Sequence, residues 1–173
     1  YLMRHEQGAV HAAQGFSRVS GKVGVCIATS GPGATNLITG IADAQIDSTP
    51  LVCITGQVAS PLLGTNGFQE TDIIGISMPV TKWNFQVTRP EEIPEALARA
   101  FYIAASGRPG PVLIDITKDA QFGELDFVYE KCTGIRSYQP VPKMDISAVG
   151  RAATLINESK KPLILCGHGV LLS

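Results

Sequence analysis

Val23-Gly-Val-Cys-Ile-Ala28 is a short apolar run rich in β-branched residues, and the turn Thr29-Ser-Gly-Pro-Gly-Ala-Thr-Asn36 follows it directly. Such a run is typical of a strand that is buried on both faces of a sheet. After the turn, apolar residues from Leu37 to Ala42 recur at helical spacing, which predicts a helix that ends near Asp47. This order of strand, turn and helix indicates the fold class, because the rest of the chain repeats it.

The same alternation continues on both sides of this segment. A helix is predicted over residues 5–20, ending at Gly21, and a second over residues 90–106. Residues 56–67 are predicted to form a loop, whereas residues 73–80 are ambiguous. Further buried strands are predicted at residues 51–55 and 112–116, and residues 83–87 are compatible with a strand. Together these elements predict an α/β fold with a parallel sheet flanked by helices on both faces.

The chain changes character towards its carboxyl end. After Asp119, aromatic and charged residues mix, and Tyr138-Gln-Pro-Val-Pro-Lys143 has the composition of an extended linker. A new helix is predicted over residues 145–159, and a strand over residues 163–166. We therefore predict a first domain at 1–127, a linker at 128–143 and the start of a second domain at 144–173. Because the chain begins and stops inside elements, we expect the fold to be incomplete at both ends.

The composition excludes some classes of partner. The net charge is −1, from 14 Lys and Arg against 15 Asp and Glu, so neither a nucleic-acid nor a membrane-surface footprint is indicated. No apolar run approaches the roughly 20 residues of a membrane-spanning helix, and no signal peptide is visible. The four cysteines lack metal-binding spacing, and three lie in apolar runs, which predicts free thiols in a reducing compartment.

Ligands of parallel sheets bind outside the carboxyl ends of the strands, which here means after Ala28, Thr55 and Ile116. Glu6 opens a helix otherwise lined by alanine and glycine, where a glutamate is also favoured simply by the helix dipole. The glycine-rich turn lacks the Gly-Lys-Ser/Thr ending of a nucleotide P-loop, and a tight strand-to-helix turn is its alternative interpretation. The three histidines are too far apart in sequence to predict a metal site.

Three stretches together resemble the acetolactate synthase family of thiamine-diphosphate enzymes: Arg4-His-Glu-Gln-Gly-Ala9, the turn at residues 30–36, and Phe68-Gln-Glu70. The resemblance extends over essentially all of residues 1–173 and is most specific up to Lys118. It implies that residues 1–127 are a pyrimidine-binding domain, and that the chain ends in the start of a flavin-binding domain. The implied cofactors are thiamine diphosphate, flavin adenine dinucleotide (FAD) and Mg²⁺, with the metal ligands in a domain that this chain lacks.

The resemblance also implies residue roles. Glu6 would contact N1′ of the cofactor's aminopyrimidine and shift its tautomer, for which a carboxyl group with a raised pKa in an apolar site is suited. Cofactor contacts are implied for Ser30, Gly31, Pro32, Asn36, Ser48, Gln69 and Arg108, with Arg108 meeting the flavin. The implied substrate channel contains Phe68, Lys82 and Lys118. The alternatives are a helix cap for Ser48, a core position for Phe68, and solvated side chains for the lysines.

The implied reaction joins two pyruvates to 2-acetolactate, or pyruvate and 2-oxobutyrate to 2-aceto-2-hydroxybutyrate, with loss of carbon dioxide. It belongs to the biosynthesis of valine, leucine and isoleucine. A homodimer with a shared active site, a regulatory small subunit, and a cytoplasmic or plastid location are implied as well. We expect this chain alone to be inactive, because the diphosphate-binding segment is absent from it.

Alternatives remain open at this point. The rival thiamine enzymes are pyruvate oxidase, a 2-oxoacid decarboxylase and sulfoacetaldehyde acetyltransferase. Outside that class stand a non-catalytic nucleotide-binding module and a truncated interaction domain. The chain departs from the family at Asn66 and Thr117, which replace the usual Asp and Pro. It also has Ala59 where plant enzymes carry a proline that shapes the herbicide site, which predicts weakened sulfonylurea binding.

Overall fold

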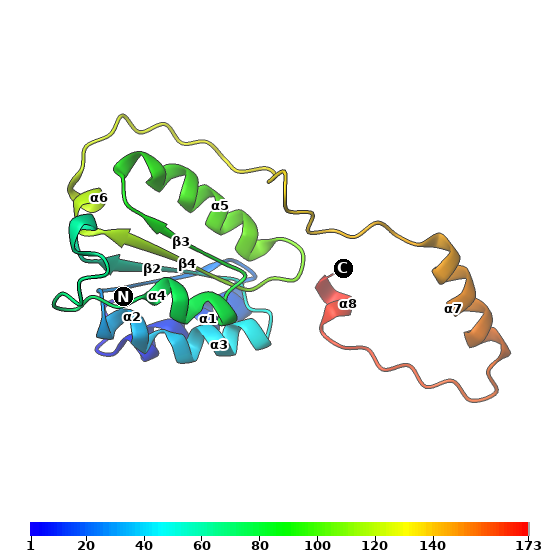
Figure 1. The fold of residues 1–173 in the computed structure, drawn as a ribbon. Coiled ribbons are helices and arrows are strands. Elements are labelled where there is room, and N and C mark those ends of the chain that lie inside the picture. Colours follow the sequence, from blue (N-terminus) through cyan, green and yellow to red (C-terminus); the bar gives the residue numbers. More distant parts are fainter. Residues whose placement is uncertain (173) are drawn as a thin grey trace.

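The computed structural model describes residues 1–172 and contains a four-stranded sheet in the order β1-β2-β4-β3. All three strand pairs are parallel. The strands are β1 (Gly24–Ala28), β2 (Leu51–Gln57), β3 (Trp83–Val87) and β4 (Pro111–Thr117). Figure 1 shows helices above and below this sheet. The predicted α/β fold with a parallel sheet is therefore confirmed.

The core has two layers because successive strand residues point to opposite faces of the sheet. Leu51, Cys53 and Leu113 lie on one face, whereas Val52 and Ile114 lie on the other. The first face is covered by α1 (Glu6–Ser20), α2 (Pro32–Asn36), α3 (Ile38–Ile46) and α4 (Ile73–Ser77). The second face is covered by α5 (Ile93–Ala105) and α6 (Lys118–Phe122). Each fully buried leucine or isoleucine of these layers contributes about 2 kcal/mol through the hydrophobic effect.

The ends of the first helix follow from local chemistry. His5 precedes α1 in extended conformation, and its ring nitrogen accepts the Gln7 N–H at 3.1 Å. Gly21 ends the helix with φ of 68°, a left-handed conformation that glycine adopts without steric cost. The predicted helix over residues 5–20 with its stop at Gly21 is confirmed.

Several short elements differ from the prediction. The glycine-rich turn contains the five-residue helix α2, and β2 runs on to Gln57. The ambiguous segment is helical, as α4 followed by the 3₁₀ helix η2 (Met78–Val80). The helix predicted over residues 90–106 is a 3₁₀ turn, η3 (Pro90–Glu92), followed by α5. A further 3₁₀ helix, η1 (Ser60–Leu62), lies in the predicted loop.

The carboxyl-terminal part lies apart from the sheet (Figure 1). Helix α7 (Ile146–Glu158) confirms the predicted helix and begins at Asp145, whose carboxylate accepts the Ala148 N–H. A short helix, α8 (Gly169–Leu172), ends the described chain. The predicted strand at residues 163–166 is wrong, because this segment has no regular structure and Leu163 is 94% exposed. An apolar run needs a neighbouring strand to satisfy its backbone, and no described residue pairs with it.

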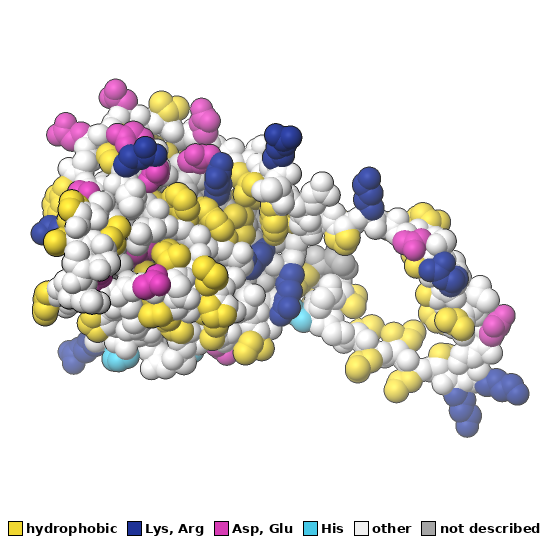
Figure 2. All heavy atoms as spheres, in the orientation of Figure 1, with side chains coloured by type: hydrophobic (Ala, Val, Ile, Leu, Met, Phe, Trp, Pro, Cys, Tyr) yellow, Lys and Arg dark blue, Asp and Glu magenta, His cyan; other side chains and the backbone are white. Residues whose placement is uncertain are grey.

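Figure 2 shows the apolar side chains of this carboxyl-terminal segment lying open on the surface. The domain boundary between residues 128 and 143 stays a prediction, and Ser173 lies outside the described residues. Within residues 1–172, no helix is both long and apolar enough to cross a membrane. All four cysteines are free thiols: Cys26 and Cys53 are buried, Cys132 is half-buried and Cys166 is exposed.

Candidate functional site

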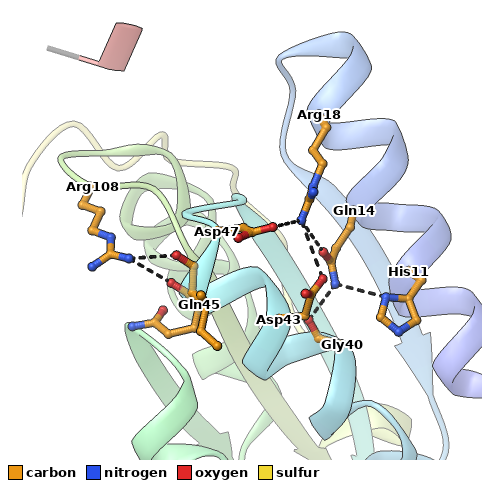
Figure 3. A network of polar contacts seen from close by, with 9 residues as sticks. His11, Gln14, Arg18, Gly40, Asp43, Gln45, Asp47 and Arg108 are labelled. Atoms are coloured by element: carbon orange, nitrogen blue, oxygen red, sulfur yellow. Dashed lines mark hydrogen bonds and ion pairs between the residues drawn. The ribbon is translucent and has the colours of Figure 1, made fainter. Parts of the chain in front are cut away.

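Packing between α1 and α3 fixes the helix that carries Glu6. An ideal Cβ on Gly40 would lie 2.2 Å from a methyl carbon of Val10, so only glycine allows the two helices this close an approach. The buried Gln14 amide donates to the Gly40 carbonyl oxygen at 2.7 Å. Arg18 of α1 adds an exposed ion pair to Asp47 at the end of α3, at 2.7 Å (Figure 3). The close approach and the buried amide bond hold α1 in place, since an exposed ion pair contributes at most about 1 kcal/mol.

Glu6 lies at the carboxyl-end edge of the sheet, at the start of α1. Its Oε2 accepts a hydrogen bond from the Asn36 side-chain amide at 3.0 Å, across 30 positions of sequence. An ideal Cβ on Gly33 would lie 2.6 Å from the Thr29 methyl carbon and 3.5 Å from the other Glu6 carboxylate oxygen, so the turn packs closely beside the carboxylate. The structure therefore brings Glu6, Asn36 and the glycine-rich turn together, as the sheet rule predicts for ligand-binding segments.

The electrostatic state of Glu6 differs from the prediction. The Asn36 amide, and after it a backbone N–H, lower the pKa of the Glu6 carboxyl group below its ordinary value. Hydrogen bonds to the charged form favour ionisation, and little burial opposes them here. The prediction that Glu6 has a raised pKa in an apolar pocket is therefore wrong for this chain alone.

The loop at residues 64–70 approaches the glycine-rich turn. A Cβ on Gly31 would lie only 2.6 Å from the Gln69 carbonyl oxygen, and Gly31 has φ of 58°. Gln69 itself has φ of 60°, a conformation that costs a residue with a side chain about 1–2 kcal/mol. Backbone strain of this kind clusters at binding sites. Gly31 and Gln69 therefore mark a close backbone contact beside Ser30 and Pro32.

Glu70 holds this loop closed. Its carboxylate accepts the backbone N–H groups of Gly64 and Gly67, the latter at 2.9 Å. These two bonds, the Gly64 bond first, lower the pKa of Glu70. Phe68 at the tip is 90% exposed, which rules out the alternative of a core position within this chain. The loop thus presents an aromatic ring to solvent at the candidate site.

Lys118 follows β4 at the same edge and is exposed. The neighbouring Asp119 carboxylate accepts the Ser60 N–H at 3.0 Å. That bond, followed by the Thr117 hydroxyl, lowers the pKa of Asp119 to about 2. The segment after β2, which includes Ala59, is therefore tied to the residues after β4. Lys118 lies at the sheet edge that the sequence predicted.

Three of the predicted residues lie at the opposite edge. Arg108 donates from Nε to the Ser48 hydroxyl at 2.8 Å, and from Nη2 to the Ile46 and Gln45 carbonyl oxygens at 3.1 and 3.3 Å. Figure 3 shows Arg108 reaching the carbonyl end of α3. Asp47 is the cap residue of the helix and the Ser48 hydroxyl accepts from Arg108, so both interpretations of Ser48 stay predictions. These bonds belong to the amino-end edge of the sheet, because Ser48 precedes β2 and Arg108 precedes β4.

Lys82 also belongs to this far edge. Its ammonium group donates to the carbonyl oxygens of Ile103 and Ser106, the latter at 2.7 Å. Its backbone is level with Pro111, at the start of β4, whereas Lys118 follows the end of that strand. Seven residue steps of about 3.3 Å separate the two levels by roughly 23 Å. The expectation that Lys82 lines one channel with Phe68 and Lys118 is therefore not met within a single chain.

A buried polar cluster escaped the sequence analysis. Asp115 is fully buried and accepts hydrogen bonds from Thr55, Gln57 and Gln86. Burial raises the pKa of Asp115, although the three donors oppose the shift. The available signal was a carboxylate inside an apolar strand, where an unpaired charge is costly. Among the described residues, no group of three or more His, Cys, Asp or Glu could hold a metal ion.

Comparison with known proteins gives these residues a context. Residues 1–76 match the family described as thiamine pyrophosphate enzyme, N-terminal TPP binding domain. The acetolactate synthase large subunit of Corynebacterium glutamicum is 60% identical over 98% of this chain and 27% of its own length. Acetolactate synthase of Mycobacterium leprae is 54% identical over 98% of this chain and 27% of its own length. The probable acetolactate synthase large subunit of Methanocaldococcus jannaschii is 52% identical over 99% of this chain and 30% of its own length.

The chain thus spans under a third of the length of the relatives it matches. Its matched family covers α1, β1, α2, α3 and β2, the elements that position Glu6 and the glycine-rich turn. By sequence, residues 1–76 are therefore similar to the N-terminal domain of thiamine pyrophosphate enzymes, and nearly the whole chain is similar to part of the acetolactate synthase large subunits.

Proposed function

We propose that this chain supplies the half-site that receives the aminopyrimidine ring of thiamine diphosphate in an acetolactate synthase. The whole enzyme would join two pyruvates to 2-acetolactate, or pyruvate and 2-oxobutyrate to 2-aceto-2-hydroxybutyrate, with loss of carbon dioxide. The observation that carries the proposal is the Glu6–Asn36 pair at the carboxyl-end edge of the sheet, where Asn36 ends the glycine-rich turn and Gly31 of that turn contacts Gln69. The relatives named above carry the same enzyme name.

The residues present fit a flat, nitrogen-containing ring. The glycines of the turn allow its backbone to pack closely against Gln69 and beside Glu6, and Glu6 offers a carboxylate whose position Asn36 fixes. When bound, thiamine diphosphate supplies a carbon nucleophile that stabilises the charge left by decarboxylation. Glu6 would hold the proton at the ring nitrogen, and Ser30, Pro32 and Gln69 would border the ring. Desolvation by the ring and a second subunit would raise the pKa of Glu6 towards the range in which it can share a proton.

The other cofactors and partners are proposals of the same kind. FAD would meet Arg108, whose hydrogen bonds to Ser48 and the end of α3 use Nε and Nη2 and leave Nη1 for a ligand. Mg²⁺ would be held by residues of the longer protein. A homodimer is supported by apolar side chains on the outer side of α1, where Val19 is 91% exposed. A small regulatory subunit is supported by the name "large subunit" of two relatives.

We also infer a cytoplasmic location rather than a plastid one, because the three relatives come from organisms that lack plastids. The substrates of the whole enzyme would be the small 2-oxoacids pyruvate and 2-oxobutyrate.

Product analysis tests the proposed reaction. A full-length chimera is made by replacing the matching residues of the Corynebacterium glutamicum large subunit with this chain. We expect the chimera, supplied with thiamine diphosphate, FAD, Mg²⁺ and pyruvate, to form 2-acetolactate. Formation of acetyl phosphate or of free aldehyde instead would favour pyruvate oxidase or a 2-oxoacid decarboxylase. No binding of thiamine diphosphate would contradict the proposal as a whole.

A further inference from the structure

The buried cluster around Asp115 links three strands at the carboxyl-end edge of the sheet. One carboxylate oxygen accepts from the Thr55 hydroxyl at 2.6 Å, and the other accepts from the side-chain amides of Gln57 at 3.1 Å and Gln86 at 3.0 Å. These donors come from β2 and β3, on either side of β4. An apolar side chain of similar volume would stabilise a strand interior as well or better. The fold alone therefore does not explain this carboxylate.

The Gln57 side chain has only one orientation that satisfies its neighbours. Its carbonyl oxygen accepts the Val58 N–H at 2.9 Å, and its amide nitrogen donates to both Asp115 and the Thr71 carbonyl oxygen, the latter at 2.9 Å. Rotating the amide by half a turn would set an oxygen against two acceptors and a nitrogen against a donor. Asp115 therefore fixes the Gln57 amide in the orientation that holds Thr71.

Thr71 is the base of the candidate-site loop. The preceding residue, Glu70, accepts hydrogen bonds from the N–H groups of Gly64 and Gly67, so these bonds connect the two ends of the loop. The Gln69 backbone carbonyl packs against Gly31 so closely that a Cβ on Gly31 would lie 2.6 Å from its oxygen. A shift of Thr71 is thus passed to the contact between the loop and the glycine-rich turn.

We propose that Gln57, oriented by Asp115, is a positioning residue that sets where Phe68 and Gln69 stand at the cofactor site. The inference rests on the proposed function in taking the loop to contact the cofactor. The way in which the loop is held follows from the hydrogen bonds described above. Gln57 does not touch the reacting groups in this account, because it is buried beneath the loop and acts through the Thr71 carbonyl.

A pair of matched variants tests the proposal in the full-length chimera. Gln57→Met and Gln86→Met each remove one amide donor from the same oxygen of Asp115, but only the first releases Thr71. Hydrogen exchange at the Gly64 and Gly67 amides reports the loop, and the dissociation constant of thiamine diphosphate reports the site. The thermal unfolding temperature of each variant is measured as well, so that a general loss of stability can be separated from a local effect on the loop.

We expect Gln57→Met to speed exchange at Gly64 and Gly67 and to weaken thiamine diphosphate binding, each by about tenfold, the scale on which supporting hydrogen bonds act. Gln86→Met should change both by less than twofold. Equal effects of the two variants, or unchanged exchange in Gln57→Met, would overturn the proposal.

If Gln57→Met does not fold, Gln57→Asn replaces it, since the shorter amide stays polar but cannot span Asp115 and Thr71. If the unmodified chimera binds no thiamine diphosphate while Gln57→Met still speeds loop exchange, the proposed function fails and the positioning role stands. Faster exchange in neither variant would leave the function intact and refute the positioning role.

Discussion

At the scale of single residues, the candidate site depends on a few backbone and carboxylate contacts between residues that are far apart in the sequence. Glu6 and Asn36 meet across 30 positions, and Gly31 meets Gln69 across 38, because the carboxyl ends of parallel strands share one edge of the sheet. The sequence indicated Glu6 and the glycine-rich turn through family resemblance. For Asp115 the only signal was a carboxylate inside an apolar strand, and a single polar residue has no periodicity that reveals its partners.

Gly31 gives the first prediction at this scale. Gly31→Ala would combine a left-handed conformation with a contact of 2.6 Å to the Gln69 carbonyl oxygen. We expect a loss of about 2 kcal/mol or more in the free energy of unfolding, measured by urea denaturation. Gly15→Ala is the matched control, because a Cβ at that helical position meets nothing within 4 Å. The control should gain up to about 1 kcal/mol. Equal stability of the two variants would contradict the described contact.

Asp119 gives a prediction about pH. Its folded-state pKa of about 2 lies below the ordinary value of 3.8, so the folded state favours the carboxylate. The stability this provides is present above about pH 4 and is lost as pH falls towards 2. Asp119→Asn should therefore reduce the decline in the urea midpoint between pH 5 and pH 2.5. Asp126→Asn, at an exposed position outside the sheet, should leave the decline unchanged. A decline that is identical in both variants would refute the link to Ser60.

At the scale of elements, long patterns were predictable and short ones were not. The four strands and the helices α1, α3, α5 and α7 follow from apolar periodicity over five or more residues. The helices α2, α4 and α6 have five residues each, too few to display a full apolar face. The strand predicted at residues 163–166 failed because strand formation depends on a partner, which no sequence pattern inside the run supplies.

The element positions predict which thiols react. Cys26 and Cys53 face one another across β1 and β2, with their sulfurs 3.4 Å apart inside the core. Cys132 and Cys166 lie in the carboxyl-terminal part and reach solvent. Titration of the native protein with a thiol reagent should therefore modify those two quickly, and the remaining two only after unfolding in denaturant. Rapid reaction of a third thiol in the native protein would contradict the burial of the β1–β2 pair.

At the scale of the whole molecule, the sheet separates two groups of predicted residues. Glu6, Asn36, Gln69 and Lys118 belong to the carboxyl-end edge, whereas Ser48, Lys82 and Arg108 belong to the amino-end edge. Sequence spacing alone could not show this division, because residues before and after a strand look equally close along the chain. The chain therefore presents the proposed half-site at one edge and a separate arginine-containing surface at the other. Its relatives are more than three times as long, which agrees with a site completed by other parts of the enzyme.

The central claim is that the Glu6 carboxyl group acts on the cofactor's pyrimidine ring, and Glu6→Gln in the full-length chimera tests it most directly. Glu95→Gln is the control, since Glu95 pairs with Arg99 on α5, remote from the site. The account predicts that Glu6→Gln lowers the rate of 2-acetolactate formation by about 100-fold or more, with an unchanged unfolding temperature, while Glu95→Gln keeps the full rate. Normal cofactor-dependent carboligation by Glu6→Gln would contradict it.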